Sequence, residues 1–175
     1  YNSLQSYVAS LATAICAPHQ DYLQLGLKRG DEYLQVSANI LQSEAEFYST
    51  IRAKRVPGEG KGFLPVLLED GVEYVEVRLL DVNPYLPVGI DASEMRFLDM
   101  LLLLALLADS PEHDDAECLR TGANIQQVVL HGRQAGTILD DHGVEKSIPE
   151  WGSEILRQLA PIAAMMDRNH GGTGY

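Results

Sequence analysis

The residue pair with the most direct chemical meaning is Glu76 and Arg78, which lie two positions apart in a predicted strand. Alternate residues of a strand point to the same face, so we expect their Cα atoms roughly 7 Å apart and both side chains in the same space. A carboxylate can then bind a divalent cation while the adjacent guanidinium binds a phosphoryl oxygen. Cross-strand ion pairs on a solvated sheet face would explain the same spacing, so both interpretations stay open at this point.

A basic cluster that follows Tyr48 is the second candidate. Arg52, Lys54 and Arg55 are three of the 13 Lys and Arg residues and lie within four positions. Such a cluster can screen the charge of a triphosphate, and a neighbouring tyrosine can hydrogen-bond a substrate carboxylate. The alternative is that Phe47 and Tyr48 are core aromatics and that the basic cluster is a solvated face.

Common catalytic and cofactor motifs are missing from the sequence. It contains no phosphate-loop Gly-Lys-Ser/Thr, no dinucleotide Gly-x-Gly-x-x-Gly after a strand, no nucleophile elbow and no zinc pattern. The five histidines are scattered through loops and helix ends. Cys16 and Cys118 lack the close spacing of a metal or redox pair, which is typical of a reduced cytosolic protein, and the sequence assigns them no role.

Composition and charge restrict the class of partner. The 175 residues are 46% hydrophobic and 22% charged, which indicates a globular chain of one ordinary domain's length. A net charge of −12 repels nucleic acid and anionic membranes. The longest apolar run, Met100–Ala108, falls far short of the roughly 20 residues needed to span a bilayer. We therefore expect no nucleic acid or membrane partner, and a small phosphorylated ligand for the positive residues between Arg52 and Lys61 and at Arg78.

Periodicity and helix caps predict the elements that must hold these residues, and together they indicate an α+β fold. The predicted elements are a helix over 4–15 capped by Ser3, a short helix or turn over 21–27, a turn at 28–31, strands over 34–40 and 72–80, and helices over 92–109, 115–132 and 149–169. The stretch 41–62 receives no regular element, and its prolines and glycines from Pro57 to Gly62 predict a mobile loop.

Two of these elements also carry predictions of burial. In the second strand, Val75, Val77 and Leu79 are expected to face a core, with the charged pair on the opposite face. The apolar run Met100–Ala108 is expected to form a buried core helix, and the apolar stripe over 155–166 in the last helix is expected to pack in the core as well.

Six blocks of the sequence together resemble a known enzyme family. The blocks are Tyr33–Gln42, Glu46–Tyr48, Ile51–Val56, Gly71–Arg78, Asp81–Pro84 and Arg96–Asp99. They occur in the order found in glutamate–cysteine ligase of the proteobacterial type, also called γ-glutamylcysteine synthetase. The similarity extends through nearly all of the chain, which makes it specific, whereas one block alone would be weak.

The resemblance implies an ATP-dependent ligase that makes γ-glutamylcysteine, the first step of glutathione biosynthesis. In this family the γ-carboxylate of L-glutamate attacks the terminal phosphate of ATP, and the amine of L-cysteine then displaces phosphate from γ-glutamyl phosphate. ATP and Mg²⁺ are the implied cofactors, and the implied location is the cytoplasm. The implied fold is similar to glutamine synthetase, with antiparallel strands of a curved sheet followed by a packed helical segment.

The resemblance also implies how the chain is organised. We expect residues 1–175 to be part of a single catalytic domain, with 1–90 forming the sheet and the wall of the active site and 91–175 forming a helical packing layer. The chain starts at Tyr1 rather than Met, and the family's enzyme is much longer, so we expect a fragment from its later part. The remainder of the enzyme chain would complete the site, and the fragment alone is expected to be inactive.

Individual roles are carried over by position in the matching blocks. The resemblance implies that Arg78 is a catalytic residue on the transferring phosphoryl group, that Glu76 is a metal ligand and that Tyr48 lines the cysteine pocket. The implied nucleotide contacts are Arg52, Lys54 and Arg55. The family's other metal-binding glutamates lie outside this chain. The alternatives are a related ATP-dependent carboxylate–amine ligase with another acceptor, and a catalytically inert ligand-binding module.

Overall fold

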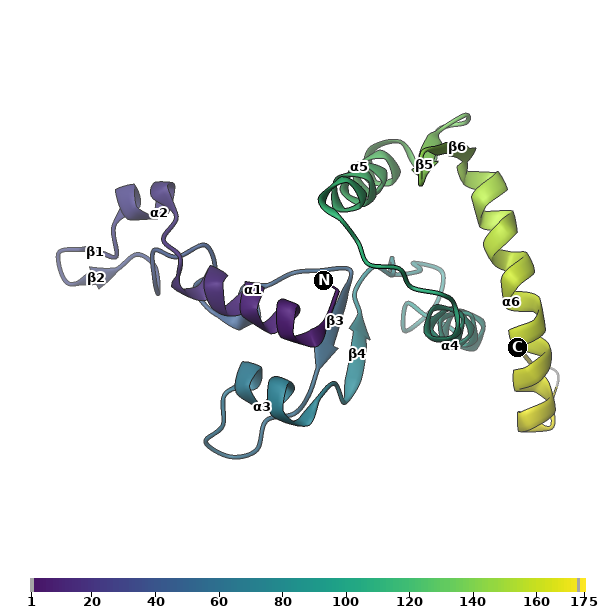
Figure 1. Cartoon of the computed structure of the whole chain (residues 1–175), viewed down its shortest axis with the longest axis horizontal. Coiled ribbons are helices and arrows are strands. Elements are labelled where there is room, and N and C mark those ends of the chain that lie inside the picture. The colour runs from purple at the N-terminus through teal and green to yellow at the C-terminus, as the bar shows by residue number, and fades with distance from the viewer. Residues whose placement is uncertain (1, 173) are drawn as a thin grey trace. The chain divides into compact units, whose positions relative to one another are not determined.

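The structure is a computed structural model that describes residues 2–172 and 174–175. The chain divides into two compact units, residues 1–81 and 82–175, and each is described by itself (Figure 1). The first unit contains α1 (Leu4–Cys16), α2 (Gln20–Leu25), β1 (Lys28–Arg29), β2 (Glu32–Tyr33), the 3-10 helix η1 (Glu44–Glu46), β3 (Ile51–Lys54), α3 (Phe63–Asp70) and β4 (Tyr74–Val77). The second unit contains α4 (Ala92–Leu107), α5 (Asp115–His131), β5 (Ile138–Asp141), β6 (Val144–Ser147) and α6 (Ile148–His170). Helices combined with antiparallel strand pairs confirm the predicted α+β class.

The core of the first unit lies between α1 and α3. Leu11 of α1 and Leu67 of α3 are 2% and 0% exposed, and Tyr7 and Val8 are buried beside them. The α1 residues recur at steps of three and four, which places them on one face of the helix. Ser3 caps α1 through a capping box, which confirms the predicted start of this helix. Full burial of each such side chain contributes about 1.5–3 kcal/mol to stability.

The strands that carry the charged residues are β3 and β4, which pair antiparallel beside α1 and α3 (Figure 1). The register pairs Ile51 with Val77, Arg52 with Glu76, Ala53 with Val75, and Lys54 with Tyr74. Directly paired residues share a face of the sheet. The register therefore gathers Arg52, Lys54 and Glu76 on one face, while Ala53 packs against the core formed by the helices.

The predicted strand over residues 34–40 is wrong. The N–H of Val36 donates to Gln42 Oε1 at 2.6 Å, a side chain from the same loop. Within this stretch only Asn39 makes a β-bridge, an isolated one to Pro18. The alternation of apolar and polar residues is real, but side-chain hydrogen bonds within the loop replace the neighbouring strand that a β-ladder needs.

Further differences concern β3, α3 and β4. The sequence does not predict β3 or α3, because they have only four and eight residues, on either side of the loop from Pro57 to Gly62, which are too few to show a clear period. The strand predicted over 72–80 is shorter, running only from Tyr74 to Val77. Its predicted core face is also wrong, since Val75 and Leu79 are 44% and 62% exposed. The unit's core reaches this sheet through Ala53 on β3 instead.

The second unit has its core between α4 and α6. Met100, Leu159 and Ile162 are buried there, and other apolar residues of α6 pack against them, which confirms the predicted stripe. Capping boxes at Asp91 and Ser147 start α4 and α6, and the side chain of Asp114 caps α5. The three predicted helices of this unit form close to their predicted bounds.

Helix α4 is less buried than predicted. Met100 is its buried residue, whereas Leu106 and Leu107 are 77% and 67% exposed. The prediction of a buried core helix over Met100–Ala108 is therefore wrong for this stretch. The physical reason is that α6 packs along one side of α4 and leaves the end of the apolar run uncovered within the described unit.

A hairpin that the sequence does not predict, β5–β6, lies between α5 and α6 (Figure 1). Its turn residues His142 and Gly143 have φ values of 52° and 86°, as in a type I′ turn. Asn124 of α5 anchors the hairpin by two bonds to Asp140: its Nδ2 donates to the carbonyl at 2.7 Å, and its Oδ1 accepts from the N–H at 2.9 Å.

Two expectations from the sequence concern membrane-spanning helices and domain organisation. Over residues 2–172 and 174–175, no helix combines the length and apolar content that crossing a membrane requires. The expected single domain, with a wall over 1–90 and a helical layer over 91–175, stays a prediction. The boundary between the two compact units falls at residues 81 and 82.

Candidate functional site

Strands β3 and β4 bring most of the predicted site residues to one pocket of about 400 Å³ in the first unit. The pocket is lined by Glu44, Ala45, Arg52, Lys54, Arg55, Val56, Pro57, Phe63, Tyr74 and Arg78. Four of the six predicted residues are on this lining. The remaining two lie next to it, because Glu76 pairs with Lys54 and Arg78, and Tyr48 stacks on Arg78.

Glu76 is the carboxylate at the centre of these positive charges. Its Oε2 lies 3.2 Å from Arg78 Nε and 3.8 Å from Lys54 Nζ, so Glu76 forms ion pairs with both cations, while the binding of a divalent cation and a phosphoryl oxygen stays a prediction. The Oε2 atom is itself buried, and neither cation reaches it with the alignment of a full hydrogen bond. The contact with Arg78 holds the pKa of Glu76 below its usual range; burial opposes this, and the charges of Lys54 and Arg52 reinforce it.

Arg52 is the deeply buried cation of the site. It is 4% exposed, and its Nη2 donates to the backbone carbonyl of Glu44 at 3.1 Å. Its Nε is buried without a hydrogen-bond partner. Leaving a charged donor buried and unsatisfied costs stability, so such a group is a candidate for binding an anion.

Arg55 uses its side chain differently. Its Nε donates to the carbonyl of Gly71 at 2.6 Å, and its Nη2 donates to the carbonyl of Asp70 at 2.7 Å. These carbonyls lie at the end of α3, where the helix leaves backbone acceptors unsatisfied and favours a cation. Arg55, which directly follows β3, therefore links the end of α3 to β3 by hydrogen bonds. Its predicted contact with nucleotide stays a prediction, since these two bonds already occupy part of the guanidinium.

The neighbouring aromatic residues Phe47 and Tyr48 have different surroundings. Phe47 packs on the core of the first unit and meets Tyr7 edge to face, with ring centroids 6.0 Å apart, so it is a core aromatic. Tyr48 is 80% exposed, and its ring centroid lies 4.9 Å from Cζ of Arg78. This distance is that of a cation–π contact. The predicted role of Tyr48 in a cysteine pocket is not tested by this geometry and stays a prediction.

The donor set for a metal ion is one carboxylate. In the described part of the chain, no three His, Cys, Asp or Glu residues cluster closely enough to hold a metal. The buried, poorly bonded Oε2 of Glu76 suits one ligand position. Mg²⁺ is commonly held by one or two carboxylates with substrate phosphates and water, so Glu76 fits as a partial site.

Six lining residues are not among the predicted site residues, and Phe63 and Tyr74 are the two aromatic ones. Phe63, at the start of α3, lies under Lys54 with 5.8 Å between Nζ and the ring centroid. Tyr74 is opposite Lys54 in the ladder. Strand alternation puts Tyr74 on the same face as Glu76, whereas the position of Phe63 depends on α3, which the sequence does not predict.

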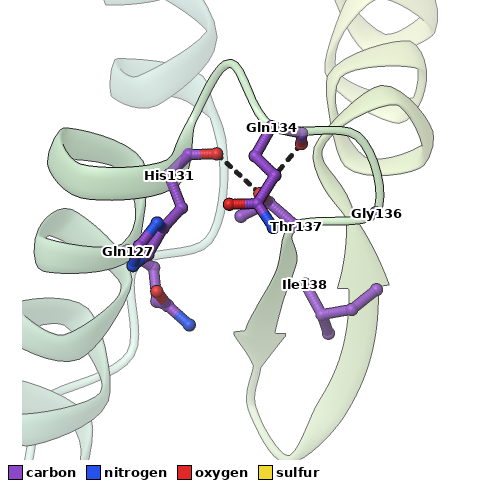
Figure 2. A pocket seen from close by; sticks show the side chains of 6 residues that line it. All are labelled: Gln127, His131, Gln134, Gly136, Thr137 and Ile138. Atoms are coloured by element: carbon purple, nitrogen blue, oxygen red, sulfur yellow. Dashed lines mark hydrogen bonds between the residues drawn. The ribbon is translucent and has the colours of Figure 1, made fainter.

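A second pocket, of about 360 Å³, lies in the second unit between the end of α5 and β5 (Figure 2). Its lining is Gln127, His131, Gln134, Gly136, Thr137 and Ile138. The Thr137 hydroxyl lies at hydrogen-bonding distance from the backbone carbonyls of His131 and Gln134, at 2.6 and 3.0 Å. This pocket contains none of the predicted site residues, and the imidazole of His131 is the one ionisable side chain on its described lining. The charged pocket on β3 and β4 is therefore the better candidate for phosphate chemistry.

Comparison with known sequences gives a consistent result. The family model described as glutamate-cysteine ligase matches residues 1–128. The chain is 46% identical to the glutamate–cysteine ligase of Azotobacter vinelandii, over 100% of this chain and 33% of that relative. It is 44% identical to the enzyme of the same name from Pseudomonas fluorescens, over 98% of this chain and 32% of the relative. The chain thus spans about a third of the length of the curated relatives it matches.

A solved structure is similar as well. It is the crystal structure of glutamate–cysteine ligase from Francisella tularensis in complex with AMP. The TM-score is 0.88 at 30% sequence identity, and the match covers 94% of this chain and 34% of that one. The fold of this chain is therefore similar to that of about one third of a larger solved protein.

Proposed function

The chain belongs to the glutamate–cysteine ligase family, and from this we propose that it forms the phosphate-binding wall of an ATP-dependent ligase. The reaction would join the γ-carboxyl of L-glutamate to the amine of L-cysteine through γ-glutamyl phosphate. One observation carries the proposal: four cationic side chains line a single pocket on β3, β4 and the following loop. A similar protein binds AMP, which supports a nucleotide as the ligand of this one.

The proposed role of the pocket residues is electrostatic. Phosphoryl transfer depends on positioning and on neutralising the charge of the phosphate oxygens more than on acid–base groups. Lys54 and Arg78 would bind these oxygens from the rim, and Arg52 would add a buried charge behind them. Because β3 and β4 are hydrogen-bonded to each other, the three cations would be held in a fixed arrangement.

Arg78 is the proposed catalytic residue. Its guanidinium lies at the rim of the pocket, between the carboxylate of Glu76 and the ring of Tyr48. Held from two sides, it is restricted in position before substrate binds, and a preorganised cation stabilises developing charge at little reorganisation cost. We further propose that the Tyr48 hydroxyl contacts the cysteine substrate.

Glu76 is the residue that would hold Mg²⁺, together with ligands from the rest of the enzyme. When bound, Mg²⁺ would supply charge neutralisation at the phosphates. Glu76 would also orient Arg78 and Lys54, which both contact its Oε2. We place the enzyme in the cytoplasm; Cys16 and Cys118 are free and exposed thiols, which suits a reducing compartment.

The proposal can be tested by exchange with a relative. The chain replaces the matching third of the Azotobacter vinelandii enzyme, to which it is 46% identical along its whole length. We expect the hybrid to form γ-glutamylcysteine from ATP, glutamate and cysteine, and the hybrid with Arg78→Ala to lose most of this activity. A hybrid that melts cooperatively, binds glutamate and makes no product would contradict the proposal. Other amino acids offered in place of cysteine test the identity of the acceptor.

The chain by itself gives a second test. We expect it to bind ATP weakly in the presence of Mg²⁺ and to form no γ-glutamylcysteine, since it spans about a third of its relatives and supplies one metal-binding carboxylate. Product formation by the chain alone would show that the expected dependence on further residues is wrong.

A further inference from the structure

Glu76 lies next to the proposed phosphate pocket and contacts two of the cations that line it. Its buried Oε2 contacts Arg78 at 3.2 Å and Lys54 at 3.8 Å, and both of these cations line the pocket. The same two side chains are the ones that a phosphate group would have to bind. The carboxylate therefore competes with the phosphates for the same cations.

The charge of Glu76 also acts directly on an incoming anion. The side chain is 37% exposed, so water screens it only in part. The carboxylate contacts two cationic side chains, so its negative charge faces the same cations that line the pocket. A phosphate entering without a counter-ion would meet this negative charge and would have to separate two ion pairs.

We propose that Glu76 makes nucleotide binding in this pocket conditional on a divalent cation. Without the cation, the carboxylate holds Arg78 and Lys54 and repels the phosphates. With the cation on its Oε2, the carboxylate no longer competes, and both side chains become available to the nucleotide. This inference rests on the proposed function, because it assumes that the pocket binds nucleotide phosphates.

Arg52 allows the effect of the Glu76 charge to be distinguished from a loss of the whole binding site. Its buried Nε has no hydrogen-bond partner, and it lies opposite Glu76 in the β3–β4 register. If the charge of Glu76 is removed while its shape is kept, four cations remain around the pocket, those of Arg52, Lys54, Arg55 and Arg78. The pocket should then attract metal-free phosphates more strongly than before.

The variant Glu76→Gln tests the proposal in the 175-residue chain. ATP binding is measured by equilibrium dialysis once with EDTA and once with excess Mg²⁺. We expect Glu76→Gln to bind metal-free ATP about tenfold more tightly than the unmodified chain, the size expected for one partly screened charge removed some 5–7 Å from a phosphate. We also expect Mg²⁺ to improve its binding much less. Glu69→Gln is the matched control, since it removes one charge from an exposed position of α3 outside the pocket.

The outcomes are distinguishable. If the unmodified chain binds Mg²⁺–ATP but Glu76→Gln binds metal-free ATP no more tightly, the role of Glu76 is overturned and the proposed function stands. If neither protein binds ATP under either condition, both are overturned. Glu76→Ala repeats the comparison with a second neutral side chain should the Gln variant fail to fold, as judged by thermal melting. A gain in metal-free binding that Glu69→Gln shares would assign the effect to net charge and would also overturn the proposal.

Discussion

Replacing Arg55 by Met separates a structural role of this residue from a nucleotide contact. The change keeps an unbranched side chain and removes two hydrogen bonds, at 2.6 and 2.7 Å, to the carbonyls of Gly71 and Asp70 at the end of α3. Bonds from a charged donor contribute about 1.5–3 kcal/mol each, and the bond to Asp70 is exposed, so we expect a combined loss of about 2–3 kcal/mol. Helix α3 should open more often, because Arg55 joins its end to β3.

Amide hydrogen exchange resolved by peptide measures this loss. A decrease of about 2 kcal/mol in the local opening free energy raises the exchange rate about 30-fold in peptides that cover α3. Helix α6 belongs to the other unit and serves as the internal control. Arg29→Met, in the exposed β1–β2 hairpin, is the matched variant and should leave α3 unchanged. The reasoning is refuted if Arg55→Met leaves exchange in α3 unchanged and weakens ATP binding tenfold or more.

The remaining predictions concern the other residues of the charged pocket. In the hybrid enzyme, Arg78→Ala should lower kcat about 100-fold, as for loss of one transition-state donor, with little change in the KM for ATP; unchanged turnover would rule out the catalytic role. Tyr48→Ala should lower kcat about two- to fivefold, because Arg78 loses its contact with the ring. Tyr48→Phe keeps the ring and should keep kcat unchanged, so an equal loss of kcat in both variants would assign the effect to the hydroxyl. The pKa of the Glu76 carboxyl, measured by NMR, should lie below the usual glutamate range, so its ion pairs persist at higher pH and are lost as the pH falls through the lowered pKa. Arg78→Ala should raise this pKa, and an unchanged pKa would contradict the pairing.

Helix starts were predictable because their signals are local. Ser3 is predicted as the cap of α1, and Asp91 and Ser147 are each followed three positions later by a glutamate, a capping-box pattern that can be read from the sequence alone. The common face of Glu76 and Arg78 was predictable for a similar reason, since strand alternation needs no knowledge of the partner strand. The resulting side chains do lie 3.2 Å apart at their nearest charged atoms.

The rest of the site depends on pairings that local pattern does not contain. Lys54 reaches Glu76 only because β3 pairs with β4 in one particular register. Arg55 binds the end of α3 across a loop of prolines and glycines, so its partners are 15 and 16 residues away. The exposure of Leu106 likewise depends on which neighbours α4 acquires, whereas the sequence shows only that the residue is apolar.

The division of the chain at residues 81 and 82 has a consequence for the order of folding during synthesis. Each unit is built from one continuous stretch of chain, and all six predicted site residues belong to the first. Synthesis proceeds from the N-terminus at about 5–20 residues per second, and units of this kind can fold as they emerge. The proposed phosphate-binding wall would therefore be assembled several seconds before α6 leaves the ribosome. Its buried cation, Arg52, would be enclosed early, with Glu76 opposite it in the β3–β4 register as the available counter-charge.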